Sequence, residues 1–269
     1  MSKVGAALER LVEVMRRLRA VDGCPWDRDQ DLKSLRPYLI EECFEVLDEM
    51  DAVVAGGPWA PLKDELGDLL FQIVFHTQLA VERQHFDMGD VCNAIADKLE
   101  RRHPHVFADA KVDGSTQVIQ NWAKLKAEER KEKKGHAGSV LDGVPTAAPA
   151  LMRAERIGEK ASRIGFDWKN LSGVRAKVTE ELAELDAAIA KQDQAAIEDE
   201  LGDVLFALAS LGRFTRTPPE DALRGALKKF ERRFRAMEAR VNAAGIAFGE
   251  ATAEQLDQYW NDAKAATSG

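Results

Sequence analysis

The chain has 269 residues, which is enough for one large domain or two modest ones. Its formal net charge of −8 argues against a general nucleic-acid binder, because such proteins gain affinity from Lys and Arg on phosphates. A hydrophobic share of 45% allows a core to form, and an aromatic share of only 7% favours helices over sheets. The sequence holds no apolar stretch of membrane-spanning length and no cysteine pair with metal-ligand spacing. We therefore expect a cytoplasmic protein that binds neither membranes nor nucleic acids directly.

Helical periodicity runs through almost the whole chain and predicts an all-α fold. A first set of helices is expected at 3–20, 30–55, 61–83, 88–103 and 115–134. A second set is expected at 148–162, 171–191, 193–214, 218–244 and 252–266. Between the sets, "KEKKGHAGSVLDGVPTAAPA" (131–150) moves from charged residues into Gly, Ser and Pro, which is typical of a linker. We predict a first domain at 1–134, a linker at 135–147 and a second domain at 148–269.

The two sets of helices carry the same sequence blocks in the same order. "DELGDLLF" begins at Asp64, and "DELGDVLF" begins at Asp199. Four further pairs match: IEECFEVLDEM (40–50) with TEELAELDAAI (179–189), KLERR (98–102) with KFERR (229–233), Trp122 and Lys126 with Trp260 and Lys264, and GCPWD (23–27) with GFDW (165–168). Because chance rarely produces five matched blocks in one order, the chain is predicted to be a tandem duplication of one helical unit.

Each half contains an acidic EExxE pattern followed by an ExxD pattern. In the first half these residues are Glu41, Glu42, Glu45, Glu65 and Asp68. In the second half they are Glu180, Glu181, Glu184, Glu200 and Asp203. On a helix, the three glutamates of EExxE fall within an arc of about 100°, and the two acids of ExxD share one face. Two such helices packed antiparallel would bring the carboxylates to one point.

Acidic pairs on helices most often form a solvated face. Here, however, Asp68 and Asp203 lie in segments that are apolar on nearly every side, which predicts burial and therefore a need for a partner. Neither half supplies enough Lys or Arg within these blocks to neutralise them, so a hard divalent cation is the simplest partner. Ligands that are all oxygen suit Mg²⁺, Mn²⁺ or Ca²⁺ and argue against zinc. Gly67 and Gly202 are expected to allow close approach of helices beside the cluster.

Basic and aromatic residues near the end of the second half suggest a nucleotide-binding surface. Lys229 and Arg233 lie on one predicted helix, and Lys264 follows Trp260 near the C-terminus. Such cations can bind the outer oxygens of a polyphosphate, and an indole ring can stack on a base. Each residue alone is more often solvated surface or core, but both halves keep the Trp-x3-Lys spacing. The "HPHVF" segment (103–107) is interpreted as a structural turn.

The acidic patterns in two copies, together with "GCPWD", "HPHVF" and "RIGFDW", resemble the MazG family within the all-α NTP pyrophosphatase superfamily. The likeness covers nearly the whole chain. The acidic pattern alone is only moderately specific, because relatives acting on dUTP, dCTP or phosphoribosyl-ATP share it, whereas the tandem architecture points to MazG. The resemblance implies a homodimer of four-helix-type units with antiparallel helices around an acidic metal site. It also implies Mg²⁺-dependent hydrolysis of NTPs, including ATP, and dNTPs to the monophosphate and pyrophosphate.

The resemblance also implies roles for individual residues, and the second repeat is the one expected to be active. Its metal ligands would be Glu181, Glu184, Glu200 and Asp203. The first repeat keeps Glu42, Glu45, Glu65 and Asp68, so the sequence does not show it to be inactive. Residues at positions expected to bind nucleotide are Lys229, Arg233, Trp260 and Lys264, with Lys126 from the first half.

The hypothesis that follows is metal-assisted hydrolysis. Mg²⁺, or Mn²⁺ in its place, would lower the pKa of a bound water that attacks the α-phosphorus, and pyrophosphate would leave. Glu180 is the candidate for orienting or deprotonating that water. Two alternatives stay open: a pyrophosphohydrolase for one nucleotide, and a helical regulatory or scaffold protein whose acidic clusters bind metal only for stability. The scaffold alternative leaves the retained Lys, Arg and Trp residues unexplained.

Overall fold

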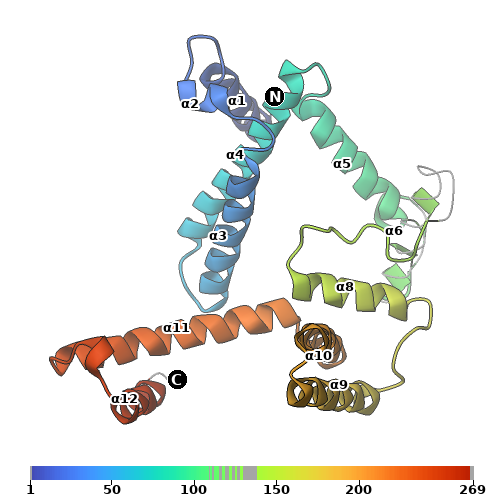
Figure 1. Cartoon of the computed structure of the whole chain (residues 1–269). Helices are drawn as coiled ribbons and strands as arrows, with labels where there is room; N and C mark the ends of the chain where they lie inside the picture. The colour runs from blue at the N-terminus through green and yellow to red at the C-terminus, as the bar shows by residue number, and fades with distance from the viewer. Residues whose placement is uncertain are drawn as a thin grey trace. The chain divides into compact units, whose positions relative to one another are not determined.

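The computed structural model describes residues 2–108, 110, 112–114, 117–118, 121–122, 125, 128–129 and 138–266. Within these residues every regular element is a helix, which confirms the all-α prediction (Figure 1). None of the described helices is both long enough and apolar enough to cross a membrane. The chain divides into two compact units, which are Met1–Glu129 and Arg130–Gly269.

Unit 1 is built around a pair of long helices, α3 and α4, which lie side by side (Figure 1). The N-terminal helix α1 packs on α4, and α5 contacts both α4 and α6. The bounds of these helices are α1 (Lys3–Leu18), α2 (Pro25–Asp29), α3 (Arg36–Val54), α4 (Trp59–Glu82), α5 (Met88–Arg102) and α6 (Pro104–Phe107).

The helix expected at 30–55 begins later than the periodicity suggests, at Arg36. The carboxylate of Asp31 accepts hydrogen bonds from the backbone N–H groups of Lys33 at 2.7 Å and Ser34 at 2.8 Å. A short acidic side chain that bonds its own backbone in this way competes with the helix and favours a turn.

The "HPHVF" segment, expected to be a turn, forms the four-residue helix α6 instead. Pro104 lies in its first turn, where the missing N–H has no helical partner to lose and the fixed φ suits a helix start. The helix expected at 115–134 lies largely outside the described residues, and Lys126 lies outside them.

The core of unit 1 lies between α1 and α4. Its five fully buried residues are Met15, Leu35, Val74, Phe75 and Leu79. Arg19, just after α1, donates from Nε and Nη2 to the two carboxylate oxygens of Glu82 at 2.6 and 2.7 Å. Its guanidinium also lies 5.4 Å from the centre of the Phe75 ring. These contacts fix α1 to the C-terminal end of α4, and the hydrogen bonds from Arg19 lower the pKa of Glu82.

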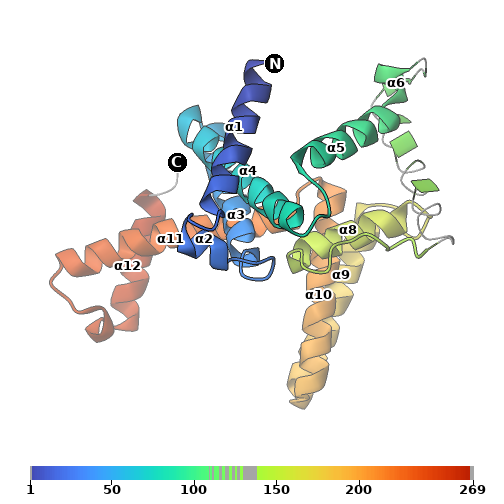
Figure 2. The same cartoon turned by 90° about the horizontal axis from the view of Figure 1, so that it is seen from above.

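Unit 2 repeats the helix pair as α9 and α10, with α8 packed on α10 (Figure 2). The long helix α11 contacts α8 and α10, and it also packs with α12. The bounds are α8 (Ala150–Ser162), α9 (Leu171–Lys191), α10 (Gln194–Thr215), α11 (Pro219–Ala243) and α12 (Ala253–Ala266), with a 3-10 turn, η1, at Phe248–Glu250.

Short connections make both helix pairs antiparallel. Only Gln192 and Asp193 join α9 to α10. Gln192 takes the left-handed conformation (φ 55°), and the carboxylate of Asp193 caps α10 by accepting from the N–H of Ala196 at 3.2 Å. In unit 1 the chain turns between α3 and α4 through Gly56, whose φ of 91° favours glycine. The antiparallel arrangement places each EExxE segment opposite its ExxD segment.

Candidate metal and nucleotide site

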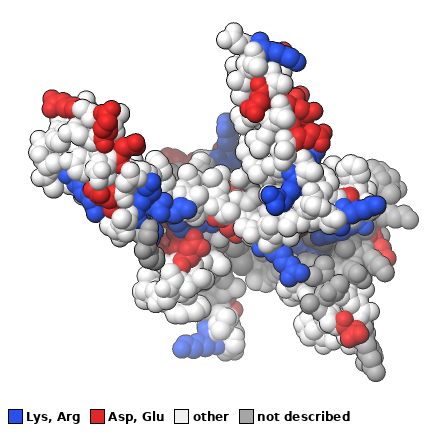
Figure 3. Space-filling model, turned by 90° about the horizontal axis from the view of Figure 1, so that it is seen from below, with Lys and Arg blue, Asp and Glu red and all other residues white. Residues whose placement is uncertain are grey.

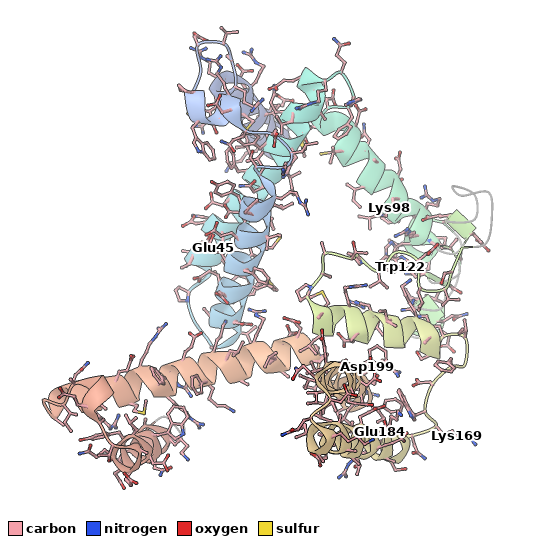
Figure 4. The ribbon with its side chains drawn as sticks, viewed as in Figure 1. Glu45, Lys98, Trp122, Lys169, Glu184 and Asp199 are labelled. Atoms are coloured by element: carbon pink, nitrogen blue, oxygen red, sulfur yellow. The ribbon has the colours of Figure 1, made fainter. Side chains whose placement is uncertain are left out.

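Three carboxylates from two helices meet in unit 2. Glu181 and Glu184 come from α9, and Glu200 comes from α10. Each offers an oxygen that lies within 4.8 Å of those of the other two. Glu181 is buried, Glu200 is half-buried and Glu184, labelled in Figure 4, is exposed, so solvent reaches the cluster.

Unit 1 contains the same arrangement. Glu42 and Glu45 on α3 and Glu65 on α4 also bring carboxylate oxygens within 4.8 Å of one another; Figure 4 marks Glu45. Loss of hydration raises the pKa of Glu42 and of Glu65, and the charges of Asp68 and Glu45 raise both further. Repulsion between the converging carboxylates contributes to these raised pKa values, and a bound cation would relieve it.

A lysine that the sequence analysis missed lies at the cluster of unit 2. The ammonium Nζ of Lys177 is 2.8 Å from Glu180 Oε1 and 2.7 Å from Glu181 Oε1, and these two bonds raise its pKa. The expectation was that neither half supplies enough Lys or Arg within these blocks, and Lys177 lies just before the block at 179–189, on the same helix α9. A signal was present, because residues three and four positions apart on a helix are neighbours. The matching position in unit 1 is Tyr38, so only the second cluster has this internal cation.

Loss of hydration also raises the pKa of Glu184. Its hydrogen bond with Glu181 and the charge of Glu200 raise this pKa further, by smaller amounts. Lys177 opposes this effect but does not cancel it. The second cluster is therefore still electrostatically strained in the absence of a further cation.

Asp68 and Asp203 are not buried, contrary to the argument from their apolar surroundings. Neither belongs to a three-carboxylate cluster. Asp203 instead lines an open depression on α10 together with Glu198, Asp199 and Gly202. The prediction failed because burial depends on the elements that pack on a helix and not on the apolar residues beside a position in the sequence. On the side of α4 and α10 opposite to these aspartates, leucines are also between 37% and 49% exposed. These leucines are Leu66, Leu70, Leu201, Leu205 and Leu208.

Gly67 and Gly202 do not serve close helix packing within either unit. A Cβ atom built at either position would meet nothing within 4 Å. No other helix of the chain therefore packs closely on either glycine. The prediction that these glycines allow close helix approach is wrong within one copy of the chain.

The residues expected to bind nucleotide lie on α11 and α12. Lys229 and Arg233 belong to α11 and Lys264 to α12, and basic and acidic side chains both lie on the surface of these helices (Figure 3). Trp260 packs against the core of the α11–α12 pair, with its ring 5.2 Å from that of Phe230. The carboxylate clusters thus come from the α3–α4 and α9–α10 pairs, whereas the cations and Trp260 come from separate elements.

Comparison with known proteins identifies the family of this chain. The MazG nucleotide pyrophosphohydrolase domain matches residues 30–107 and again residues 170–237. The chain belongs to this family. Each MazG match contains one of the three-carboxylate clusters, which confirms both the resemblance and the tandem duplication.

Two relatives match this chain over nearly its whole length. The chain is 45% identical over 260 residues to a nucleoside triphosphate pyrophosphohydrolase of Escherichia coli K12, covering 96% of this chain and 97% of the relative. It is 43% identical over 264 residues to "Nucleoside triphosphate pyrophosphohydrolase/pyrophosphatase MazG" of Thermotoga maritima, covering 98% of each. A nucleoside triphosphate pyrophosphohydrolase of Mycolicibacterium smegmatis is 37% identical over 163 residues, covering 59% of this chain and 48% of the relative.

Proposed function

We propose that this chain hydrolyses nucleoside and deoxynucleoside triphosphates to the monophosphate and pyrophosphate. The observation that carries the proposal is the cluster of Glu181, Glu184 and Glu200, which offers three carboxylates to one point inside a MazG domain. The names of the Escherichia coli and Thermotoga maritima relatives, which match 96% and 98% of this chain, support the same activity.

The residues present fit a hard divalent cation. The donors are all carboxylate oxygens, their spacing suits shared coordination, and they lack full neutralisation by protein cations. We propose Mg²⁺, with Mn²⁺ as a substitute, at both clusters, and we propose Asp203 and Asp68 as further ligands. When bound, such a cation would offset the negative charge of the triphosphate and activate water for attack.

The side chains around the second cluster supply the remaining steps. Glu180 is exposed and held by Lys177, so its carboxylate is free on its other side to accept the proton of the water that attacks the α-phosphorus. Lys229, Arg233 and Lys264, with Lys126, would bind the phosphate oxygens and offset the charge of leaving pyrophosphate. The Trp260 ring would pack beneath these cations and hold α12 against α11, or it would stack on the nucleotide.

We also propose that the chain acts as a homodimer. The exposed leucines of α10, Leu201, Leu205 and Leu208, form an apolar face of a kind that soluble monomers rarely leave open. A second copy of the chain that packed on this face would bury these leucines.

Adding Mg²⁺ to the protein without nucleotide is expected to raise its melting temperature. At a concentration 100 times the dissociation constant, the gain is about 2.7 kcal/mol, which corresponds to roughly 5–10 °C for a chain of this size. Because the pKa values of Glu42, Glu65 and Glu184 are raised, protons compete for these carboxylates as the pH falls, so the shift should be smaller at pH 5 than at pH 7.5. Differential scanning calorimetry measures this, with NaCl of equal ionic strength as the control. An equal shift with NaCl would contradict a specific cation site.

The direct test of the activity is to mix the protein with the common NTPs and dNTPs and Mg²⁺, and to identify the phosphorus products by ³¹P NMR. Monophosphate and pyrophosphate are expected for several bases. Diphosphate and orthophosphate would mean that attack at the α-phosphorus is wrong. Turnover of a single nucleotide would favour a narrow pyrophosphohydrolase, and no turnover would favour a metal-stabilised scaffold.

A further inference from the structure

The two carboxylate clusters differ in the side chain that holds their first glutamate. In unit 2 this glutamate is Glu181, and its Oε1 lies 2.7 Å from the ammonium Nζ of Lys177. In unit 1 it is Glu42, which accepts a hydrogen bond from the side-chain amide of Gln72 on α4. Loss of hydration raises the pKa of Glu42, and this hydrogen bond opposes the rise. A positive group thus holds the glutamate in unit 2, and a neutral group holds it in unit 1.

Neither partner has a counterpart in the other repeat. Alignment of the EExxE segments pairs Lys177 with Tyr38, and alignment of the "DELGD" copies pairs Gln72 with Ala207. A tyrosine brings no positive charge, and an alanine side chain brings no hydrogen-bonding atom. Both exchanges act in the same direction, because they leave unit 1 with more net negative charge and with one more oxygen donor beside its cluster.

The amide oxygen of Gln72 has no hydrogen-bond partner among the described residues. The residue is only 4% exposed, so bulk water does not supply that partner. The same amide group reaches Glu42, which places its free oxygen beside the three carboxylates of unit 1. A buried polar atom without a partner is unfavourable, and amide oxygens, like carboxylates, are ligands of hard divalent cations. The free oxygen therefore indicates that unit 1 accommodates a cation.

In unit 2 an ammonium group already stands where a cation would bind. Nζ of Lys177 bonds both Glu180 Oε1, at 2.8 Å, and Glu181 Oε1. A divalent cation on the same oxygen of Glu181 would lie next to a like charge, and the repulsion between them weakens its binding. The ammonium therefore competes with a free cation for this cluster.

We propose that unit 1 holds a resident divalent cation in the nucleotide-free protein, with Gln72 as its positioning residue, and that Lys177 makes the cluster of unit 2 the weaker cation site. This inference rests on the proposed function, which assigns a cation to both clusters. A cation that arrives with a triphosphate brings negative charge with which the displaced ammonium can pair, whereas a free cation brings none. The cation of unit 1 is thus structural, and that of unit 2 exchanges with the substrate.

Binding of Mn²⁺ to the nucleotide-free protein tests this inference, because electron paramagnetic resonance measures the free ion in solution. We expect two classes of site in each chain, with dissociation constants that differ by roughly 10-fold or more. Glu42→Gln should remove the tighter class, and Glu181→Gln should remove the weaker class. A single class of equal sites would overturn the proposal, and so would loss of the tighter class in Glu181→Gln.

Exchanges between the repeats provide matched variants. Tyr38→Lys gives unit 1 the ammonium of unit 2 at a position that is 38% exposed, and it should weaken the tighter class by roughly 10-fold. Lys177→Tyr is the reverse exchange and should strengthen the weaker class by a similar factor. Unchanged dissociation constants in both folded variants would overturn the role of the lysine.

Gln72→Met removes the amide and keeps a side chain of similar length. We expect it to weaken the tighter class by about 10- to 100-fold and to leave the weaker class unchanged. A merely structural role of Gln72 would lower the melting temperature without changing the affinity of the folded protein for Mn²⁺, and that result would overturn its positioning role.

The outcome is separate from that of the activity test. If the protein hydrolyses no nucleotide but its two clusters bind Mn²⁺ unequally as described, the proposed function fails and the resident cation of unit 1 stands. If nucleotides are hydrolysed but the two clusters bind Mn²⁺ equally, the proposed function stands and this inference is overturned.

Discussion

Replacing Glu181 by glutamine is expected to lower kcat/KM for triphosphate hydrolysis by about 10³-fold. Glu181 is 5% exposed, and its carboxylate converges with those of Glu184 and Glu200. Of the three carboxylates it is the most buried, so water is least able to replace it as a metal ligand. Removing a cation ligand forfeits several kcal/mol of transition-state stabilisation, and about 1.4 kcal/mol corresponds to a factor of ten. The rate of pyrophosphate release at saturating Mg²⁺ measures the effect.

Glu42→Gln makes the same change in the cluster of unit 1 and is the matched control. If only the second repeat is active, this variant keeps most of its turnover and loses only metal-dependent stability. Glu180→Gln tests the general base: turnover at the wild-type rate in this variant would remove that role. Turnover of Glu181→Gln within a fewfold of wild type would contradict the metal site itself.

Replacing Phe75 by alanine is expected to reduce the free energy of unfolding of unit 1 by about 3–5 kcal/mol. Its ring is fully buried among Met15, Leu35 and Leu79, and Arg19 lies over its face. The deletion leaves a cavity in the core and removes the surface on which α1 is held. Urea unfolding followed by circular dichroism measures the loss as a lower midpoint of the transition that includes unit 1.

Phe166→Ala is the control for this experiment, because Phe166 is 80% exposed and its loss should change the free energy of unfolding by about 0.5 kcal/mol or less. A loss below about 1 kcal/mol for Phe75→Ala would show that α1 is not held on α4 by this core.

The sequence by itself determined the helical class, the duplication and most of the acidic cluster. These features depend on local spacing: a period of 3.6 residues selects one face of a helix, and EExxE places Glu181 and Glu184 on that face. The short Gln192–Asp193 connection then leaves little choice but an antiparallel partner carrying Glu200. The contacts of Lys177 with Glu180 and Glu181, three and four residues later, also follow from local spacing, although Lys177 lies outside the acidic block at 179–189.

Only the tertiary structure decided which faces of these helices are covered. Asp68 and Asp203 stand in equally apolar sequence, yet both are exposed, because burial depends on the elements that pack on a helix and not on its composition. The pocket of unit 2 that Phe206 and Ser210 of α10 line, together with residues of α8 and of the segment before α9, is likewise a product of packing. Spacing along one helix carries no information about the elements that enclose such a pocket.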